Sequence, residues 1–237
     1  MEYERFENLL SRFIQACNER LDFGIEDMHY YSCLPLCALD AIFSIGVHYS
    51  GTSRTIDDFC REFDIPRAAP KPFQVPSRSS QTTVGQVLEK LKDVTPAMLA
   101  NRISNLQRTS TKGGILKAEA FMLWLDILEL YEIQTYQDFH KKGKKGNLEQ
   151  DLRAVRGQGS GISTNYFYML AGNTNDVKVD RHIMAFTLSA TGEDKLSPSV
   201  VKDLFTAAVK EFQSNRPGLT VRHLDHIVWE YQRSSTR

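Results

Sequence analysis

The sequence lacks any apolar run long enough to cross a bilayer. A membrane-spanning helix needs about 20 mostly apolar residues, whereas charged residues make up 24% of this chain and break up its apolar stretches. The first residues, MEYERFENLL, are charged and amphipathic, without the apolar core of a secretory signal peptide. We therefore expect no membrane partner and a cytoplasmic or nucleoid-associated location.

Cysteine is scarce, and this limits the kinds of site that the chain can build. The four cysteines all lie within its first 60 residues: Cys17, Cys33, Cys37 and Cys60. Without an export signal we expect reduced thiols rather than disulfides. His29, Cys33 and Cys37 follow one another at intervals of four residues, so a metal-dependent enzyme is an alternative. Because no fourth ligand is evident and Pro35 interrupts the run, we favour small buried thiols and expect no metal.

An excess of positive charge is also absent, because 29 basic side chains balance 29 acidic ones. A protein that only coats nucleic acid is usually clearly basic, but local patches matter more than the total charge. One patch is HKKGKKGN at 140–147, with four lysines: Lys141, Lys142, Lys144 and Lys145. We interpret this patch as a solvated loop, with phosphate contact as the alternative.

Strand hairpins are missing from the pattern, and most segments show the spacing of a helix. Apolar residues recur on one face of the segment 3–21, and the segment 36–49 is apolar nearly all round, as in a buried helix. Further helices are expected at 55–64 with Thr55 as its cap, at 83–94 and 95–107 with a threonine at each start, and at 115–131, 135–142, 197–213 and 220–232. Four prolines between 66 and 76 indicate a long loop. The predicted fold class is all-α.

The segment DLRAVRGQGSGISTNYFYMLAGN, 151–173, is the most informative part of the chain. It predicts a helix that ends near Arg156, a turn, and a second helix from Ile162 to Ala171. The turn consists of Gly157, Gln158, Gly159, Ser160 and Gly161. Its glycines allow a tight backbone that exposes N–H groups, and the second helix adds the positive end of its dipole. This combination is typical of a phosphate site, although an ordinary corner between two helices would look similar.

A strand-like run stops at Asp180 in VKVDRHIMAF, 177–186, and a helix follows directly. The carboxylate of Asp180 can accept the free N–H groups of the first helical turn and so act as a cap. A carboxylate held there can also be a catalytic group, and the two roles are compatible because the helix N-terminus favours its negative charge.

These motifs together resemble the helix-hairpin-helix DNA glycosylases. LRAVRGQGSGIS, NYFYMLAG and VDRH occur in the order and at the spacing of that family. ILKAEAFM is similar to the family's helix before the hairpin, ALDAIFSIGVHYS to its first core helix, and LDHIVWEY to a terminal helix of some relatives. The resemblance spans roughly residues 35–187 and the tail. It implies a two-lobed helical bundle, with lobe one at about 1–30 plus 190–237 and lobe two at about 31–189, containing the hairpin 152–171.

The resemblance also implies a reaction. Breaking a base–sugar bond builds positive charge on the deoxyribose, which a fixed anion stabilises while it orients the attacking water. Asp180 would be this essential carboxylate, and Arg156 with the turn 157–161 would bind double-stranded DNA. The base would be flipped into a cleft between the lobes, and the product would be an abasic site. We expect a monomer without a cofactor; the alternative is that a monovalent cation binds at the hairpin.

Three departures from the family pattern refine this expectation. Gly161 stands where bifunctional relatives carry a lysine, so we expect hydrolysis without lyase activity and room for a bulky or phage-type modified base. No cysteine lies near the C-terminus, where some relatives hold an iron–sulfur cluster. The turn 44–50, SIGVHYS, lacks the usual glutamine, so the wedge that fills the gap left by the flipped base would be one of four residues: Ile45, Val47, His48 or Tyr49.

Further candidate residues lie on the predicted helices. Asp40 sits on an apolar helix, near the place where adenine-excising relatives carry a glutamate. It is either a second acid with a raised pKa or a structural carboxylate bonded to its neighbours. Tyr30, Tyr31 and Tyr166 are candidates to stack on the extruded base, with plain core packing as the alternative; His182 is interpreted as structural.

The sequence therefore predicts a monofunctional DNA glycosylase for base excision in DNA repair or in defence against modified phage DNA. The principal alternative is a DNA-binding protein that keeps the same fold without catalysis.

Overall fold

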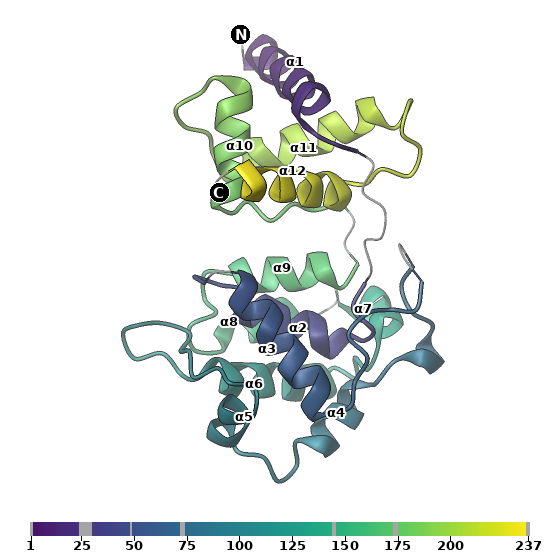
Figure 1. The fold of residues 1–237 in the computed structure, drawn as a ribbon, viewed down its shortest axis with the longest axis vertical. Coiled ribbons are helices and arrows are strands. Elements are labelled where there is room, and N and C mark those ends of the chain that lie inside the picture. Colours follow the sequence, from purple (N-terminus) through teal and green to yellow (C-terminus); the bar gives the residue numbers. More distant parts are fainter. Residues whose placement is uncertain are drawn as a thin grey trace. The chain divides into compact units, whose positions relative to one another are not determined.

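The computed structural model describes residues 2–23, 30–47, 49–71, 74–143, 146–172 and 175–235. Every regular element within these ranges is helical, which confirms the predicted all-α class (Figure 1). The β-pairings among the described residues are two isolated bridges, Tyr31 with Ala68 and Arg108 with Leu116. None of the described helices is both long enough and apolar enough to cross a membrane.

The chain divides into two compact units, each with its own hydrophobic core. Unit 1 comprises Met1–Glu26 and Asn173–Arg237, and unit 2 comprises Asp27–Gly172. The described residues of unit 1 form four helices: α1 (Glu2–Arg20), α10 (Arg181–Thr191), α11 (Pro198–Phe212) and α12 (Val221–Ser235). In Figure 1, α1 is purple and its three partners are green to yellow.

The boundary between the units differs from the expected lobe boundary, which was placed near 189. Phe186 of α10 packs edge-on against Phe13 of α1, with 5.9 Å between the ring centroids, and Phe205 of α11 packs 5.0 Å from the same ring. Because the apolar face of α10 is buried against α1 and α12, this helix and the preceding Asp180 belong to unit 1 rather than to the lobe with the turn 157–161.

Unit 2 is built around α2 (Leu34–Phe43), which is buried at every position. The other helices of unit 2 are α3 (Tyr49–Glu62), α4 (Val84–Lys90), α5 (Pro96–Arg102), α6 (Lys117–Leu130), α7 (Tyr136–Lys142), α8 (Leu148–Ala154) and α9 (Ile162–Leu170), with a short 3₁₀ helix at Arg78–Ser80. Helices α3, α4, α6 and α9 contact α2. The all-round apolar pattern of α2 is explained by this position.

Local start signals predicted several helix ends, and one prediction was wrong. Thr83 and Thr95 cap α4 and α5 as expected, because each side chain accepts an N–H group of the first turn. Thr55, in contrast, lies inside α3, which begins six residues earlier at Tyr49. The Thr55 hydroxyl is buried and donates to Gly51 O at 3.0 Å, so tertiary packing extends the helix past its apparent cap.

Candidate functional site

Asp180 caps α10, as its position in the sequence predicted. Its Oδ1 accepts the N–H groups of His182 at 2.8 Å and of Ile183 at 3.1 Å. Within the described part of the chain, its Oδ2 accepts no hydrogen bond. The side chain is half-buried. One carboxylate oxygen is therefore fixed by the helix, while the other remains available to a ligand.

The extended segment 176–180, which leads into α10, is fastened to two helices of unit 1. Asp176 forms an ion pair with Lys202 of α11, with 2.7 Å between Oδ1 and Nζ. The N–H group of Lys178 donates to Asp225 Oδ1 of α12 at 3.0 Å, and Lys178 O accepts the N–H group of Asp180 at 2.7 Å. The position of Asp180 thus depends on contacts with residues far along the chain.

Asp225 was not singled out in the sequence, although a signal was present. It lies next to Leu224 on an amphipathic helix and is only 7% exposed, so it is a carboxyl group on a buried face. Burial first, and the negative charge of Asp180 second, raise the pKa of Asp225 to about 8, while Lys178 and Arg222 oppose the shift. The same signal, a carboxylate among apolar residues, drew attention to Asp40.

An aromatic group lies where α10 meets α12. The His182 ring packs edge-on against Trp229, with 6.2 Å between centroids, and His226 stacks on the same indole at 6.4 Å. Arg233 lies 5.0 Å from the Trp229 ring centre. The packing of His182 agrees with its interpretation as a structural residue. Trp229, which is half-buried, was not predicted as part of a site.

The turn 155–161 joins α8 to α9 through two close backbone hydrogen bonds. Gln158 donates its N–H group to Val155 O at 2.9 Å, and Gly161 donates to Gln158 O at 3.0 Å. Gly157 and Gly161 have φ angles of +89° and +76°, which side-chain-bearing residues adopt at a cost. Gln158 is 3% exposed and faces inward.

The other two residues of the predicted phosphate site, Gly159 and Ser160, are exposed. Among the described residues their N–H groups donate to no acceptor. The turn therefore presents two available backbone donors in front of the N-terminus of α9. Backbone N–H groups of this kind suit the oxygen atoms of a phosphate.

The loop 103–116, between α5 and α6, packs against this turn. Thr109 belongs to the loop between α5 and α6 and packs so tightly against Gly157 that a Cβ atom there would overlap its hydroxyl oxygen. In the same loop, a Cβ at Gly113 would lie 3.0 Å from Arg156 Nη2. Arg108 and Lys112 of the loop are exposed. They add positive charge to the Arg156 side of the turn, and the sequence pattern did not connect them with it.

The lysines of the 140–147 patch are not equivalent. Lys141 is exposed. Lys142 forms an ion pair with Glu132, with 2.8 Å between Nζ and Oε2, and also donates to Glu132 O at 3.2 Å. Lys144 and Lys145 lie outside the described residues. Of the two described lysines, Lys142 forms an ion pair and Lys141 forms none with the described residues.

Asp40 and two of the predicted tyrosines come together in unit 2. Asp40 is 1% exposed, and its Oδ2 accepts the hydroxyl groups of Tyr31 at 3.0 Å and of Tyr166 at 3.1 Å. Burial, followed by the charge of Asp40, raises the pKa of Tyr31 well above its ordinary value, so this hydroxyl remains a donor. Tyr30 lies elsewhere, in the core, edge-on to Tyr136 at 6.2 Å.

The candidate wedge turn after α2 is held by a buried lysine. Lys117 Nζ donates to Phe43 O at 3.1 Å, to Ile45 O at 2.8 Å and to Gln107 Oε1 at 3.1 Å. Ile45 and Val47 are half-buried, Tyr49 is the first residue of α3, and His48 lies outside the described residues. Lys117 therefore fixes the backbone of the turn that would carry a wedge.

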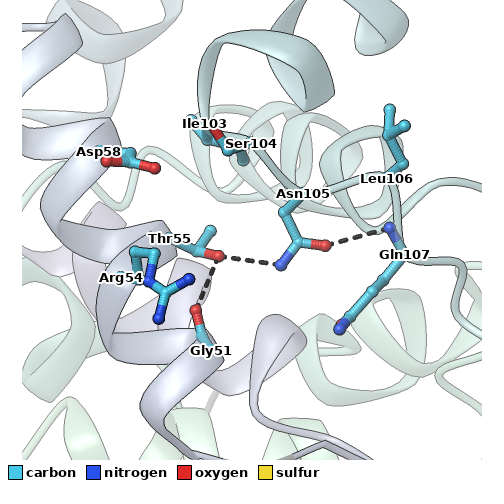
Figure 2. Close-up of a pocket in the computed structure, with 9 residues that line it drawn as sticks. All are labelled: Gly51, Arg54, Thr55, Asp58, Ile103, Ser104, Asn105, Leu106 and Gln107. Atoms are coloured by element: carbon cyan, nitrogen blue, oxygen red, sulfur yellow. Dashed lines mark hydrogen bonds between the residues drawn. The ribbon is translucent and has the colours of Figure 1, made fainter.

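A polar hollow lies between α3 and the segment 103–107 (Figure 2). Asn105 Nδ2 donates to Thr55 Oγ1 at 2.9 Å, and the N–H group of Gln107 donates to Asn105 Oδ1 at 3.0 Å. None of the site residues predicted from the sequence lines this hollow. The hydrogen bond from Gln107 N–H to Asn105 instead helps to position Gln107, whose Oε1 accepts from Lys117 Nζ.

The buried Lys117 makes a testable contribution to stability. In Lys117→Met, the Ile45 carbonyl group loses its donor, while Phe43 O keeps the Thr52 hydroxyl. A buried unsatisfied polar group costs about 1–3 kcal/mol. We expect the free energy of unfolding, measured by urea denaturation, to fall by about that amount. Lys112→Met, which removes an exposed lysine from the adjoining loop, should be nearly neutral. Equal stability of the two variants would show that the Lys117 contacts are not important.

No group of histidine, cysteine, aspartate or glutamate suited to a metal ion occurs among the described residues. Cys33 and Cys37 are buried thiols that form no disulfide, and the Cys37 Sγ lies 3.0 Å from Tyr136 Oη. Cys17 is likewise free and buried, and Cys60 is free and partly exposed. His29, the third member of the alternative metal site, lies outside the described residues.

Comparison with protein families gives one assignment. The model of the family described as Domain of unknown function (DUF8548) matches residues 10–233, and the chain belongs to this family. Neither the curated proteins nor the solved structures contain a match.

Proposed function

We propose that this member of the family is a monofunctional DNA glycosylase, which hydrolyses the N-glycosidic bond of a damaged or modified base flipped out of double-stranded DNA. The observation that carries the proposal is the state of Asp180. One of its oxygens is held by two N–H groups, while the other accepts no hydrogen bond from the described residues. The motif resemblance in the sequence supplies the reaction class for this carboxylate.

The geometry of Asp180 suits the charge that develops in this reaction. As the base departs, the deoxyribose carbon becomes positively charged, and an anion already in place stabilises it without reorganising. Capping keeps Oδ1 at the N-terminus of α10 and so fixes the position of the carboxylate. Oδ2 would then face the sugar and accept a proton from the attacking water.

The turn 157–161 gives the proposal a way to bind the DNA backbone. The N–H groups of Gly159 and Ser160 would donate to phosphate oxygens, in the manner of a helix-hairpin-helix motif. Arg156, Arg108 and Lys112 would add sequence-independent attraction, which weakens as salt concentration rises. Base recognition would fall to other residues.

The burial and contacts of Asp40 suit a residue that positions its neighbours better than one that acts directly in catalysis. At 1% exposed, Asp40 has no surface for a nucleobase. Its two tyrosine partners come from α9 and from the residues just before α2, and Tyr31 is partly exposed. In the proposed enzyme, Asp40 would orient Tyr31 as a wall of the base pocket.

Excision without strand cleavage is the expected result of the first assay. Duplexes that each carry one modified or mismatched base, and natural DNA rich in modified bases, are incubated with the protein and then divided. Because Gly161 and the rest of the turn offer no amine for a Schiff base, strands should break only in the portion heated in alkali, and borohydride should trap no protein–DNA adduct. Breakage without alkali would contradict the monofunctional assignment.

The same assay separates the proposal from the non-catalytic alternative. That alternative is favoured by the fact that helix capping alone accounts for the position of Asp180. A protein that binds duplex DNA, yet releases no base from any member of a broad panel, would support the alternative. Release of one base would identify the substrate.

A further inference from the structure

We infer that Asp225 is the positioning residue of Asp180: through the N–H group of Lys178 it holds the segment that presents the proposed catalytic carboxylate. The inference rests on the proposed glycosylase function for its catalytic consequence. The contacts that it describes lie within unit 1 and do not depend on that function.

Two hydrogen bonds of the Lys178 backbone link Asp225 to Asp180, and we call this link the tether. Asp225 Oδ1 accepts the Lys178 N–H group at 3.0 Å, and Lys178 O accepts the Asp180 N–H group at 2.7 Å. Asp225 itself sits on α12, which packs against α10. A displacement of the Asp225 side chain would therefore be passed to the backbone of Asp180, and a misplacement of about 1 Å can cost about a hundredfold in rate.

The surroundings of Asp225 favour its acid form at neutral pH. Burial first, and the negative charge of Asp180 second, raise the pKa of Asp225 to about 8. Lys178 and Arg222 act in the opposite direction. Of the pair Asp180 and Asp225, only Asp180 is then negatively charged near pH 7.

Besides Lys178 and Arg222, which act on Asp225 directly, two histidines of the packed helices contact other groups. His182 of α10 and His226 of α12 pack on the Trp229 ring, and burial lowers the pKa of His226. On the side of α11, Lys202 pairs with Asp176. The ionisation of Asp225 therefore places a second negative charge beside Asp180, and a buried charge of this kind is relieved by local opening. Opening would release Lys178 and displace Asp180.

The pH profile of excision tests this inference. Parent, Asp225→Asn and Asp225→Ala are compared from pH 6 to 10 in single-turnover assays on the base identified above. Asparagine keeps an Oδ1 acceptor and cannot ionise, so its rate should match the parent at pH 6.5 and persist at pH 9. The parent should retain about a tenth of its rate at pH 9, one unit above the pKa.

Alanine removes the tether itself. Asp225→Ala should lower the rate about 10–100-fold at every pH with little change in DNA affinity, because the carboxylate is misplaced while the DNA contacts remain. Asp203→Asn, on the exposed face of α11, serves as the control and should behave as the parent. The inference is overturned if asparagine keeps the alkaline decline of the parent, or if alanine and asparagine give the same rates.

Two further measurements distinguish failure of the tether from failure of the glycosylase proposal, because neither needs a substrate. The Lys178 amide should exchange slowly with solvent in the parent and in Asp225→Asn, and much faster in Asp225→Ala; equal exchange in all three would disprove the tether. In addition, the stability that protonated Asp225 contributes is fully present below its unfolded pKa and is lost as pH rises towards 8. The melting temperature of Asp225→Asn relative to the parent should therefore rise between pH 4 and 8, and a constant difference would disprove the acid form.

Discussion

Asp180→Asn should abolish base excision and leave the protein folded. Asparagine caps a helix about as well as aspartate, so the free energy of unfolding in urea should change by less than about 0.5 kcal/mol. The single-turnover excision rate should fall about a thousandfold or more, because the substitution removes the anion that faces the developing charge on the sugar. Alkali-dependent strand cleavage of the identified substrate measures the rate.

A matched pair of cap variants separates chemistry from stability. Ser197 caps α11 of the same unit, and its hydroxyl oxygen accepts the N–H group of Val200 at 3.3 Å. Ser197→Ala should cost about 1 kcal/mol of stability without changing the excision rate of the folded protein. If Asp180→Asn instead excises bases at the parental rate, Asp180 is a structural cap, and any activity must arise elsewhere.

Gly157→Ala should unfold the turn that we propose binds phosphate. Its φ angle of +89° is unfavourable for alanine by about 1–2 kcal/mol, and the added Cβ would overlap Thr109 Oγ1. Together these effects should lower the free energy of unfolding by about 2–3 kcal/mol. DNA affinity, measured by fluorescence anisotropy at fixed salt, should fall at least about tenfold, since each 1.4 kcal/mol of lost binding energy is tenfold.

Gly159→Ala is the control within the same turn. A Cβ at Gly159 would meet no atom within 4 Å, and its φ lies outside the left-handed region. The variant should be as stable as the parent, but its methyl group would hinder a phosphate approaching the nearby N–H groups, so DNA affinity should still fall several-fold. Parental affinity in Gly159→Ala would show that the turn amides do not contact DNA, and parental stability in Gly157→Ala would contradict the close packing on Thr109.

Short-range interactions explain which predictions from the sequence were confirmed. The caps of Thr83, Thr95 and Asp180 depend on N–H groups within the next turn of helix, so a few neighbouring residues suffice to specify them. The buried helix α2 could be recognised because apolar residues surround its whole circumference. Thr55 was misjudged because its hydroxyl can bond within a helix as well as at the start of one.

The candidate site could be predicted only in part from such short-range interactions. Asp180 and the turn 157–161 could be named from local motifs, and the pairing of Asp40 with Tyr166 could not, because 126 residues separate them. The contact of Thr109 with Gly157 and the three bonds of Lys117 likewise join distant segments. Sequence periodicity indicates which face of a helix is buried, and it does not indicate which partner that face meets.

The sequence by itself determined the helical class, the capped helix starts at Thr83 and Thr95, and the carboxylate that caps α10, since these follow from interactions within a few residues. Only the tertiary structure decided that α10 belongs with α1 and α12, and that Asp225 reaches Lys178 across 47 positions. The physical reason is that burial and charge at a site are set by the elements packed around it. Those elements come from both ends of the chain.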